Sequence, residues 1–204
     1  YNGASQWITS PQARADGHQW RARACALLTG IGTVLHDNPR LDVRDIAPPR
    51  QPQVVVLDSQ LRTPPNAQLF IATRARSIYA GGGFDADFVA RKAALQASGA
   101  QIEQFAGTDG HVDLRAVIHH LGRRGINELH VEAGQQLNGA LLRAGLVDEL
   151  LLYLAPKLLG DGLGMANIGA LESLAQGMAL EFTDVQRVGP DLRLLAQPPG
   201  RHQF

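Results

Sequence analysis

The chain is poor in cysteine and in long apolar runs, and each shortage excludes a class of protein. Cys25 is the only cysteine among the 204 residues. Neither a disulfide framework nor a cysteine-based zinc site can therefore form within the chain, which fits a reducing cytoplasm. No segment approaches the roughly 18 apolar residues of a membrane helix, and no signal peptide is recognisable. We therefore expect a cytoplasmic protein without a membrane partner.

Net charge is also absent, because 19 basic residues balance 19 acidic ones. This balance argues against a nucleic-acid partner, since such proteins are usually basic. Arginine supplies 17 of the basic residues and lysine only two. Arginine suits bidentate phosphate contacts, although a skewed base composition in the genome produces the same ratio. The first 102 residues carry four more basic than acidic side chains, which suits a small phosphorylated ligand and is equally compatible with chance.

Apolar runs, turn residues and caps predict a regular alternation of strands and helices. Hydrophobic residues make up 45% of the chain, enough for a sizeable core in one domain. We expect helices over residues 11–24, 32–36, 85–97, 114–124 and 135–144. We expect strands over residues 25–29, 53–58, 69–73, 77–83, 100–105, 128–132, 149–154, 180–188 and 191–197. The alternation predicts an α/β sandwich, and the closing antiparallel pair predicts a mixed sheet.

Common ligand motifs are incomplete or missing. "GIGTVL" (residues 30–35) lacks the third glycine of a dinucleotide fingerprint, and no P-loop is present. "GDGLG" (residues 160–164) fits a flexible loop without a ligand equally well. His119 and His120 are adjacent on an expected helix, so they point apart. We therefore expect solvated histidines and no metal.

"HVEAGQQLNGALL" (residues 130–142) is more informative. It predicts a strand that ends in Glu132, a turn at Gly134 and a helix whose first amides can bind an anion. Strand ends of this kind commonly border ligand sites in α/β proteins. An ordinary strand–turn–helix connection with a solvated glutamate fits the same letters.

"GIGTVLHDNPRLDVR" (residues 30–44) follows a buried strand and mixes many polar types. Its glycines let the backbone approach a flat ligand closely. Thr33 and Asp37 lie one helical turn apart, and Arg44 can reach a phosphate. We interpret the stretch as a binding site, while a capped turn with an exposed edge remains the alternative.

The helix expected from residue 11 carries Arg14, His18 and Arg21 on one face, because their offsets are four and three residues. Such a face can bind phosphate, and it can equally be the solvated side of the helix.

Five motifs occur in order: "SQWIT", "GIGTVLHDNPRLDVR", "VVLDSQLRTP", "HVEAGQQLNGALL" and "VDELLLYLAPKLLGDG". From Ser5 to about residue 195 the chain closely resembles the reductase domain of the bacterial bifunctional riboflavin-biosynthesis deaminase/reductase. The resemblance implies a dihydrofolate-reductase-like three-layer α/β sandwich with a mixed, mostly parallel central sheet. It also implies NADPH-dependent reduction of 5-amino-6-(5-phosphoribosylamino)uracil to its ribitylamino product, and a homodimer.

The resemblance assigns site residues as well. The substrate contacts that it implies are Ser5, Arg21, Leu41, Arg44 and Glu132. The NADP contacts that it implies are Trp7, Thr33, Asp37, Ser59 and the turn formed by Gly134, Gln135, Gln136, Leu137 and Asn138. We expect Arg21 and Arg44 to hold the ribose phosphate. As catalytic residues we expect Asp37 and Glu132, which can supply a proton or stabilise a cationic imine.

The chain also departs from the family. The deaminase half with its zinc signature is absent, and so is the short strand that normally precedes "SQWIT". We therefore expect residues 1–204 to form a single reductase domain. The usual Asp-Asp-Pro appears as Asp37-Asn38-Pro39, and Cys25 stands where an aspartate is expected.

Three alternative functions remain open. The chain could reduce a related pyrimidine that keeps its 2-amino group, or it could be a non-catalytic NADP-binding paralogue. It could also be an oligomerisation domain with an interface on "ELLLYLAPKLL" (residues 149–159). No 2′-phosphate clamp is identifiable, because Arg74 and Arg76 are equally compatible with solvated side chains.

Overall fold

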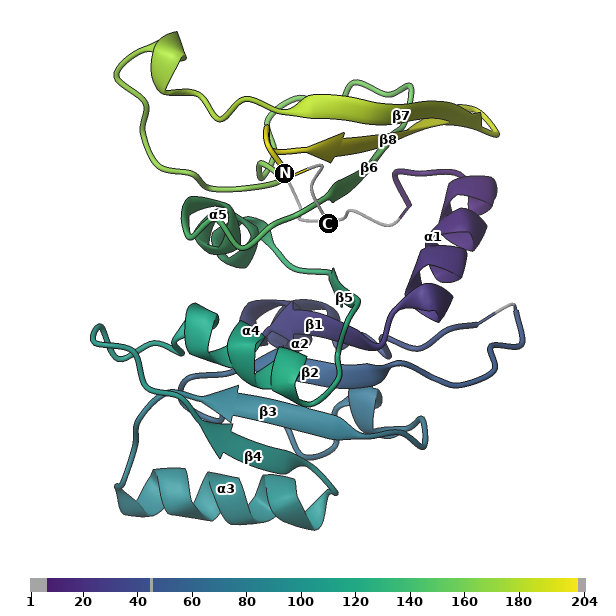
Figure 1. The fold of residues 1–204 in the computed structure, drawn as a ribbon. Coiled ribbons are helices and arrows are strands. Elements are labelled where there is room, and N and C mark those ends of the chain that lie inside the picture. The colour runs from purple at the N-terminus through teal and green to yellow at the C-terminus, as the bar shows by residue number, and fades with distance from the viewer. Residues whose placement is uncertain (1–6, 45, 202–204) are drawn as a thin grey trace.

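Two separate sheets organise the fold (Figure 1). The computed structural model describes residues 7–44 and 46–201. Five strands of this part pair in parallel in the order β4 (Gln101–Gln104), β3 (Arg76–Ala80), β2 (Gln53–Leu57), β1 (Ala26–Gly30) and β5 (Leu129–Val131). Three strands pair antiparallel in the order β6 (Leu150–Leu154), β8 (Asp191–Gln197) and β7 (Glu181–Val188). The α/β class with a mostly parallel central sheet is confirmed, and the closing antiparallel pair bonds to β6 in a sheet of its own.

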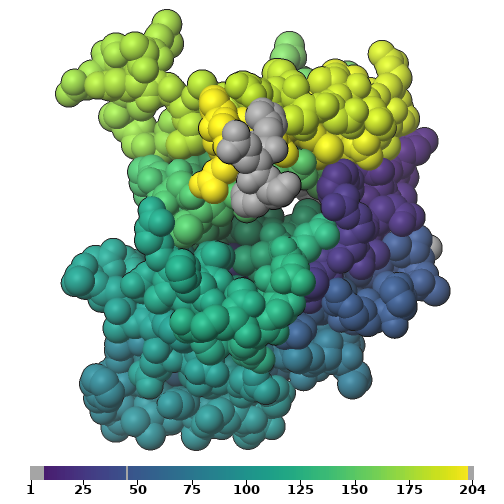
Figure 2. All heavy atoms as spheres, in the orientation of Figure 1, coloured from purple at the N-terminus to yellow at the C-terminus, as the bar shows by residue number. Residues whose placement is uncertain are grey.

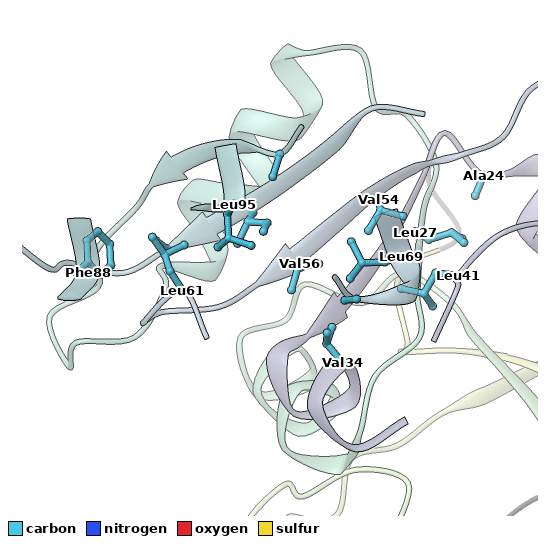
Figure 3. Packing of buried hydrophobic residues seen from close by; sticks show 14 residues of the cluster. Ala24, Leu27, Val34, Leu41, Val54, Val56, Leu61, Leu69, Phe88 and Leu95 are labelled. Atoms are coloured by element: carbon cyan, nitrogen blue, oxygen red, sulfur yellow. The ribbon is translucent and has the colours of Figure 1, made fainter. Parts of the chain in front are cut away.

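The parallel sheet is covered on both faces, as the apolar strands predict. Helices α2 (Ile31–Asp37) and α3 (Ala86–Ala97) contribute to the core cluster on one face, which Figure 3 shows from close by. Helix α4 (Leu114–Arg123) contributes to a second cluster, against which Leu137 of α5 (Gln135–Arg143) packs. Fully burying one such aliphatic side chain stabilises the fold by about 1.5–3 kcal/mol. The two clusters therefore bury the parallel sheet on both faces.

Side-chain caps fix where the long helices begin. The Ser10 hydroxyl accepts a hydrogen bond from the Ala13 amide at 3.2 Å, and proline follows at the first position of α1 (Pro11–Arg23). Asp85 and Asp113 cap α3 and α4 in the same way. The helices predicted from these caps are confirmed to within one residue at either end.

One predicted strand is wrong. Residues 69–73 form no strand, because Gln68–Phe70 make a short 3-10 helix, η1, followed by bends. The carbonyls of Phe70 and Ala72 accept hydrogen bonds from the Arg76 guanidinium at 2.8 and 2.5 Å. A side chain thus takes the bonds that a strand would give to its neighbour. A second 3-10 helix, η2, spans Leu174–Gln176.

The histidine pair on α4 also differs from expectation. His119 is exposed, but His120 is only partly exposed. Its ring packs edge-on against Tyr79 and Phe105, with centroids 5.7 and 5.0 Å away. His120 is therefore part of the packing under α4 and not a solvated side chain.

Helix α1 lies beside both sheets (Figure 1), and polar side chains join it to each of them. Asp16 accepts hydrogen bonds from Tyr153 of β6 at 2.5 Å and from Arg193 of β8 at 3.2 Å. Near the other end, Arg23 forms an ion pair with Glu128, just before β5, at 3.3 Å. The helix therefore joins the antiparallel sheet to the parallel one.

The antiparallel sheet, and the segment between its strands β6 and β7, are far more exposed than the parallel sheet. Most of β7 is exposed, whereas the last four residues of β2 and β3 are all buried. The side chains of Leu158 and Leu174 are 102% and 98% exposed. Across the described residues, no helix has the length and apolar character needed to cross a membrane.

Candidate functional site

A cavity of about 1520 Å³ lies between α1 and the facing edges of the two sheets. Most of its lining comes from α1, residues 37–44, residues 126–132 and residues 146–153. Figure 2 shows the surface hollowed beside the purple atoms of α1. Strands β5 and β6 are neighbours across this space without pairing to each other. The volume exceeds the usual 300–1,000 Å³ of small-molecule pockets, so the cavity can hold a ligand with several parts.

The cavity brings together half of the site residues expected from the sequence. Those that line it are Trp7, Arg21, Asp37, Leu41, Arg44, Glu132 and Asn138. Those outside its lining are Thr33, Ser59, Gly134, Gln135, Gln136 and Leu137. Ser5 lies outside the described residues. The expected substrate residues are thus concentrated in the cavity, and most expected cofactor residues lie elsewhere.

Arg21 and Glu132 contact each other across the cavity wall. The guanidinium binds both carboxylate oxygens, through Nε to Oε1 and through Nη2 to Oε2 at 2.6 Å. His130 Nε2 lies 3.4 Å from Oε1. Burial would raise the pKa of Glu132, but hydrogen bonds from His130 and Arg21 outweigh it and lower this pKa to about 2. Glu132 is therefore a fixed negative charge at neutral pH.

A second charged cluster is centred on Asp42. Its side chain is buried, with 3% of the residue exposed. Oδ1 accepts from Arg44 Nη1 at 2.8 Å, and Oδ2 accepts from Arg40 Nε at 2.9 Å. Both arginines line the cavity, whereas Asp42 does not. We call residues 40–44 the arginine loop.

Side chains from elsewhere bind six of the ten backbone groups of the arginine loop. Arg74 donates to the carbonyls of Arg40 and Leu41, and Arg21 donates to the carbonyl of Asp42. The Gln51 side chain exchanges two hydrogen bonds with the backbone of Val43. His18 Nδ1 accepts a hydrogen bond from the Arg44 amide. These contacts come from α1, from just before β2 and from just before β3. The loop is therefore held in one conformation without belonging to a sheet.

Leu41 has a left-handed backbone, with φ of 51°, and its side chain is buried in the core cluster of Figure 3. This conformation is strained for a branched aliphatic residue. Only the backbone of Leu41 can therefore face a ligand. Its carbonyl is already bound by Arg74, whose pKa burial lowers to about 10. Arg74 and Arg76 both donate to backbone carbonyls, so neither is merely a solvated side chain.

The expected cofactor residues lie along the carboxyl edge of the parallel sheet. Strand β1 ends at Gly30, opposite Leu57 at the end of β2, and β5 ends beside them. Thr33 follows in the first turns of α2, Ser59 follows β2, and Gly134 follows β5. Because parallel strands end at the same edge, these three turns gather on one side of the sheet.

Backbone contacts shape this edge. The Ser59 hydroxyl accepts from the Val112 amide at 3.2 Å, and the Ser59 carbonyl accepts from the Gly81 amide at 3.1 Å. A Cβ on Gly81 would lie 2.8 Å from the Gly110 carbonyl oxygen. Glycine is therefore required at position 81 for the turns after β3 and β4 to approach each other.

The turn into α5 presents open space to a ligand. Gly134 is the N-cap and provides no side-chain hydrogen bond, and a Cβ there would meet nothing within 4 Å. Asn138 donates to the Ala133 carbonyl at 3.0 Å and to the Met165 carbonyl at 2.9 Å. The residues after the glycine-rich segment 160–164 are therefore anchored on the start of α5.

Nowhere in ranges 7–44 and 46–201 do three or more metal-binding side chains cluster.

Sequence reasoning missed Asp42, Gln51 and His130. The spacing in "RLDVR" carried a readable signal, because Asp42 lies two residues from both Arg40 and Arg44. Alternate residues of a strand share one face, so the strand expected over residues 128–132 would have placed His130 beside Glu132. Gln51 carried no such signal, because its partner lies across a loop.

Comparisons with known proteins identify the family of the chain. The model of the RibD C-terminal domain family matches residues 1–194. The riboflavin biosynthesis protein RibD of Escherichia coli K12 is 40% identical over 206 residues, which cover 95% of this chain and 54% of that protein. The 5-amino-6-(5-phosphoribosylamino)uracil reductase of Buchnera aphidicola is 31% identical over 97% of this chain and 98% of its own length.

A solved structure of Acinetobacter baumannii RibD superposes with a TM-score of 0.78 at 29% identity, covering 97% of this chain and 53% of that one. The chain spans about half the length of most curated relatives that it matches. The fold is thus the dihydrofolate-reductase-like one of RibD reductase domains. With nearly its whole length matched in sequence and in structure, the chain belongs to the RibD C-terminal domain family.

Proposed function

We propose that the chain is an NADPH-dependent reductase that converts the ribose of 5-amino-6-(5-phosphoribosylamino)uracil to a ribityl chain in riboflavin biosynthesis. The observation that supports this most is the pairing of an arginine-rich cavity with a fixed carboxylate, Glu132. The arginines would bind the phosphate of the substrate, and the carboxylate would stabilise a cationic sugar imine. The name of the Buchnera relative points to the same substrate.

The carboxyl edge fits a dinucleotide. The open turn at Gly134 and the first amides of α5 would hold the pyrophosphate, because a helix N-terminus favours an anion. Thr33 and Ser59 would offer hydroxyls to the sugars from the neighbouring turns. When bound there, NADPH supplies the hydride that the reduction needs.

The cavity residues divide the remaining work. Arg44 and Arg40 hold the phosphate with guanidinium groups that are each 42% exposed. Glu132, with its low pKa, cannot donate a proton, so it stabilises positive charge on the imine. Arg21 holds Glu132 in place. Asp37 lines the cavity and is exposed, and we assign it the proton transfer.

We also propose a cytoplasmic homodimer. Exposed large apolar side chains concentrate in residues 154–185, including Leu158, Leu174 and Phe182. Apolar surface of this kind commonly marks a protein–protein interface. Sedimentation velocity tests the dimer, and a single species with the mass of one chain would contradict it.

The function is tested by following NADPH oxidation with the phosphoribosylamino uracil. Parallel reactions contain NADH, or the analogue that keeps its 2-amino group. We expect turnover that depends on the uracil substrate and favours NADPH. Turnover of the 2-amino analogue alone would reassign the substrate. Cofactor binding without turnover of either pyrimidine would identify a non-catalytic NADP-binding protein.

A further inference from the structure

Asp42 is the one carboxylate among the described residues that binds two cavity arginines at once without lining the cavity itself. Its Oδ1 binds Arg44 Nη1 at 2.8 Å, and its Oδ2 binds Arg40 Nη2 at 2.7 Å. A guanidinium carries five N–H donors. Each arginine therefore keeps donors for a ligand while one part of its guanidinium is fixed from behind.

The charged groups around Asp42 carry a net positive charge that can balance a dianion. Four guanidinium groups lie here, those of Arg21, Arg40, Arg44 and Arg74, together with the carboxylates of Asp42 and Glu132. Four positive and two negative groups leave two positive charges. A phosphate monoester carries about −1.5 to −2 at neutral pH. Asp42 therefore leaves the cluster able to neutralise a phosphate.

The backbone at Asp42 is held independently of its side chain. Arg21 Nη1 donates to the Asp42 carbonyl at 3.2 Å, and Gln51 exchanges two hydrogen bonds of 2.9 Å with Val43. A change from Asp42 to asparagine keeps the side-chain shape and these contacts. Such a change therefore acts on the orientation of the arginines and not on the path of the loop.

From this geometry we propose that Asp42 is a positioning residue, which acts through Arg40 and Arg44 to set the phosphate-binding end of the cavity. The proposal rests on the proposed function, because it takes the ribose phosphate as the ligand of these arginines. It makes a prediction of sign. If Asp42 acted only through its charge, its neutralisation would strengthen phosphate binding, because one negative charge disappears. If Asp42 positions the arginines, neutralisation weakens phosphate binding.

The test compares Asp42→Asn with wild type in steady-state kinetics. We expect the KM for the phosphoribosylamino uracil to rise about tenfold, as for one lost charge-assisted hydrogen-bond network, with kcat and the KM for NADPH changed less than about twofold. Ribose 5-phosphate should weaken as a competitive inhibitor by a similar factor, while ribose should be unaffected. An unchanged or lower KM for the phosphorylated substrate overturns the proposal.

Asp191→Asn is the matched control. Asp191 is also buried, at 2% exposed, and accepts a hydrogen bond from the Ser10 amide at 2.7 Å, yet it does not line the cavity. It reports the general effect of neutralising a buried aspartate. If Asp191→Asn raises the KM for the phosphorylated substrate as much as Asp42→Asn does, the effect is not one of positioning.

A double-mutant cycle keeps the proposal testable if Asp42→Asn lowers stability. Positioning through Arg40 and Arg44 requires that Asp42→Asn raises the KM by a smaller factor in the Arg44→Gln background than in wild type. Independent, multiplicative effects contradict the proposal. Calorimetry with ribose 5-phosphate separates the two levels of inference. If wild type binds ribose 5-phosphate but turns over neither pyrimidine, the proposed function fails, and the affinity of Asp42→Asn for ribose 5-phosphate still decides the role of Asp42. If wild type neither binds it nor turns over, both fail.

Discussion

The carboxyl edge and the cavity present different chemical groups to a ligand. At the edge, turns after β1, β2 and β5 offer glycines, amides and hydroxyls, and their neighbours are local or lie in adjacent strands. In the cavity, charged side chains meet from distant parts of the chain, as Arg21 and Glu132 do. The edge is suited to a ligand that needs backbone contacts, and the cavity to one that needs fixed charge.

This difference implies that cofactor and substrate recognition can be disturbed separately. A change at the edge should act on the KM for NADPH, and a change in the cavity should act on the pyrimidine. The following variants test that separation, from the largest expected effect to the smallest.

Glu132→Gln removes the fixed negative charge from the cavity. We expect kcat/KM for the pyrimidine to fall about 10²–10³-fold, the usual effect of losing one electrostatic stabiliser, with the KM for NADPH nearly unchanged. Glu103→Gln, on β4 at the far side of the parallel sheet, is the control and should keep full activity. A rise in the KM for NADPH by a similar factor would show that the carboxyl edge and the cavity do not act separately.

Asp37→Asn tests the residue that both assignments share, since it was expected to contact the cofactor and lines the cavity. We expect kcat to fall about 10²-fold, because general acid–base catalysis contributes at least that much. Binding of NADPH, measured by fluorescence titration, should weaken far less. A variant as active as wild type would exclude an acid–base role for Asp37.

Gly134→Val places a branched side chain in the open turn before α5. A Cβ at this position meets no atom within 4 Å, so the free energy of unfolding should change by less than about 1 kcal/mol. The KM for NADPH should nevertheless rise about tenfold, because the side chain occupies the space of the ligand. Gly122→Ala on α4, also in open space, is the control. Unaltered NADPH kinetics would move the cofactor away from this turn.

The free energy of unfolding at acid pH should depend on the ionisation of Glu132. Its pKa falls from 4.5 to about 2 on folding, so its stabilising contribution is complete above pH 4.5 and is lost as the pH falls toward 2. The shift corresponds to at most about 3 kcal/mol. Urea unfolding should show wild type losing its advantage over Glu132→Gln between about pH 4.5 and pH 2. A pH-independent difference would contradict the lowered pKa.

The sequence predicted the carboxyl edge better than the cavity, for a physical reason. A strand followed by glycine and a helix is a local pattern, so the turn at Gly134 could be read from neighbouring letters. Gln51 and Arg74 act on a loop that they do not adjoin, and no periodicity indicates such partners. The same limit explains the wrong strand at residues 69–73, whose carbonyls turn to Arg76.

Helix α1 sets a dimension of the molecule as well as contributing side chains. Its 13 residues span about 20 Å at 1.5 Å per residue, and it is fastened to β6 and β8 through Asp16 and to the strand end at Glu132 through Arg21. The helix thus acts as a spacer of fixed length between the two sheets. Deleting one residue between its two attachments would turn them about 100° out of phase, so the sheet separation and the Arg21–Glu132 pair could not both persist. The distance between the two attachments is therefore set by the five-residue spacing of Asp16 and Arg21 in one helix.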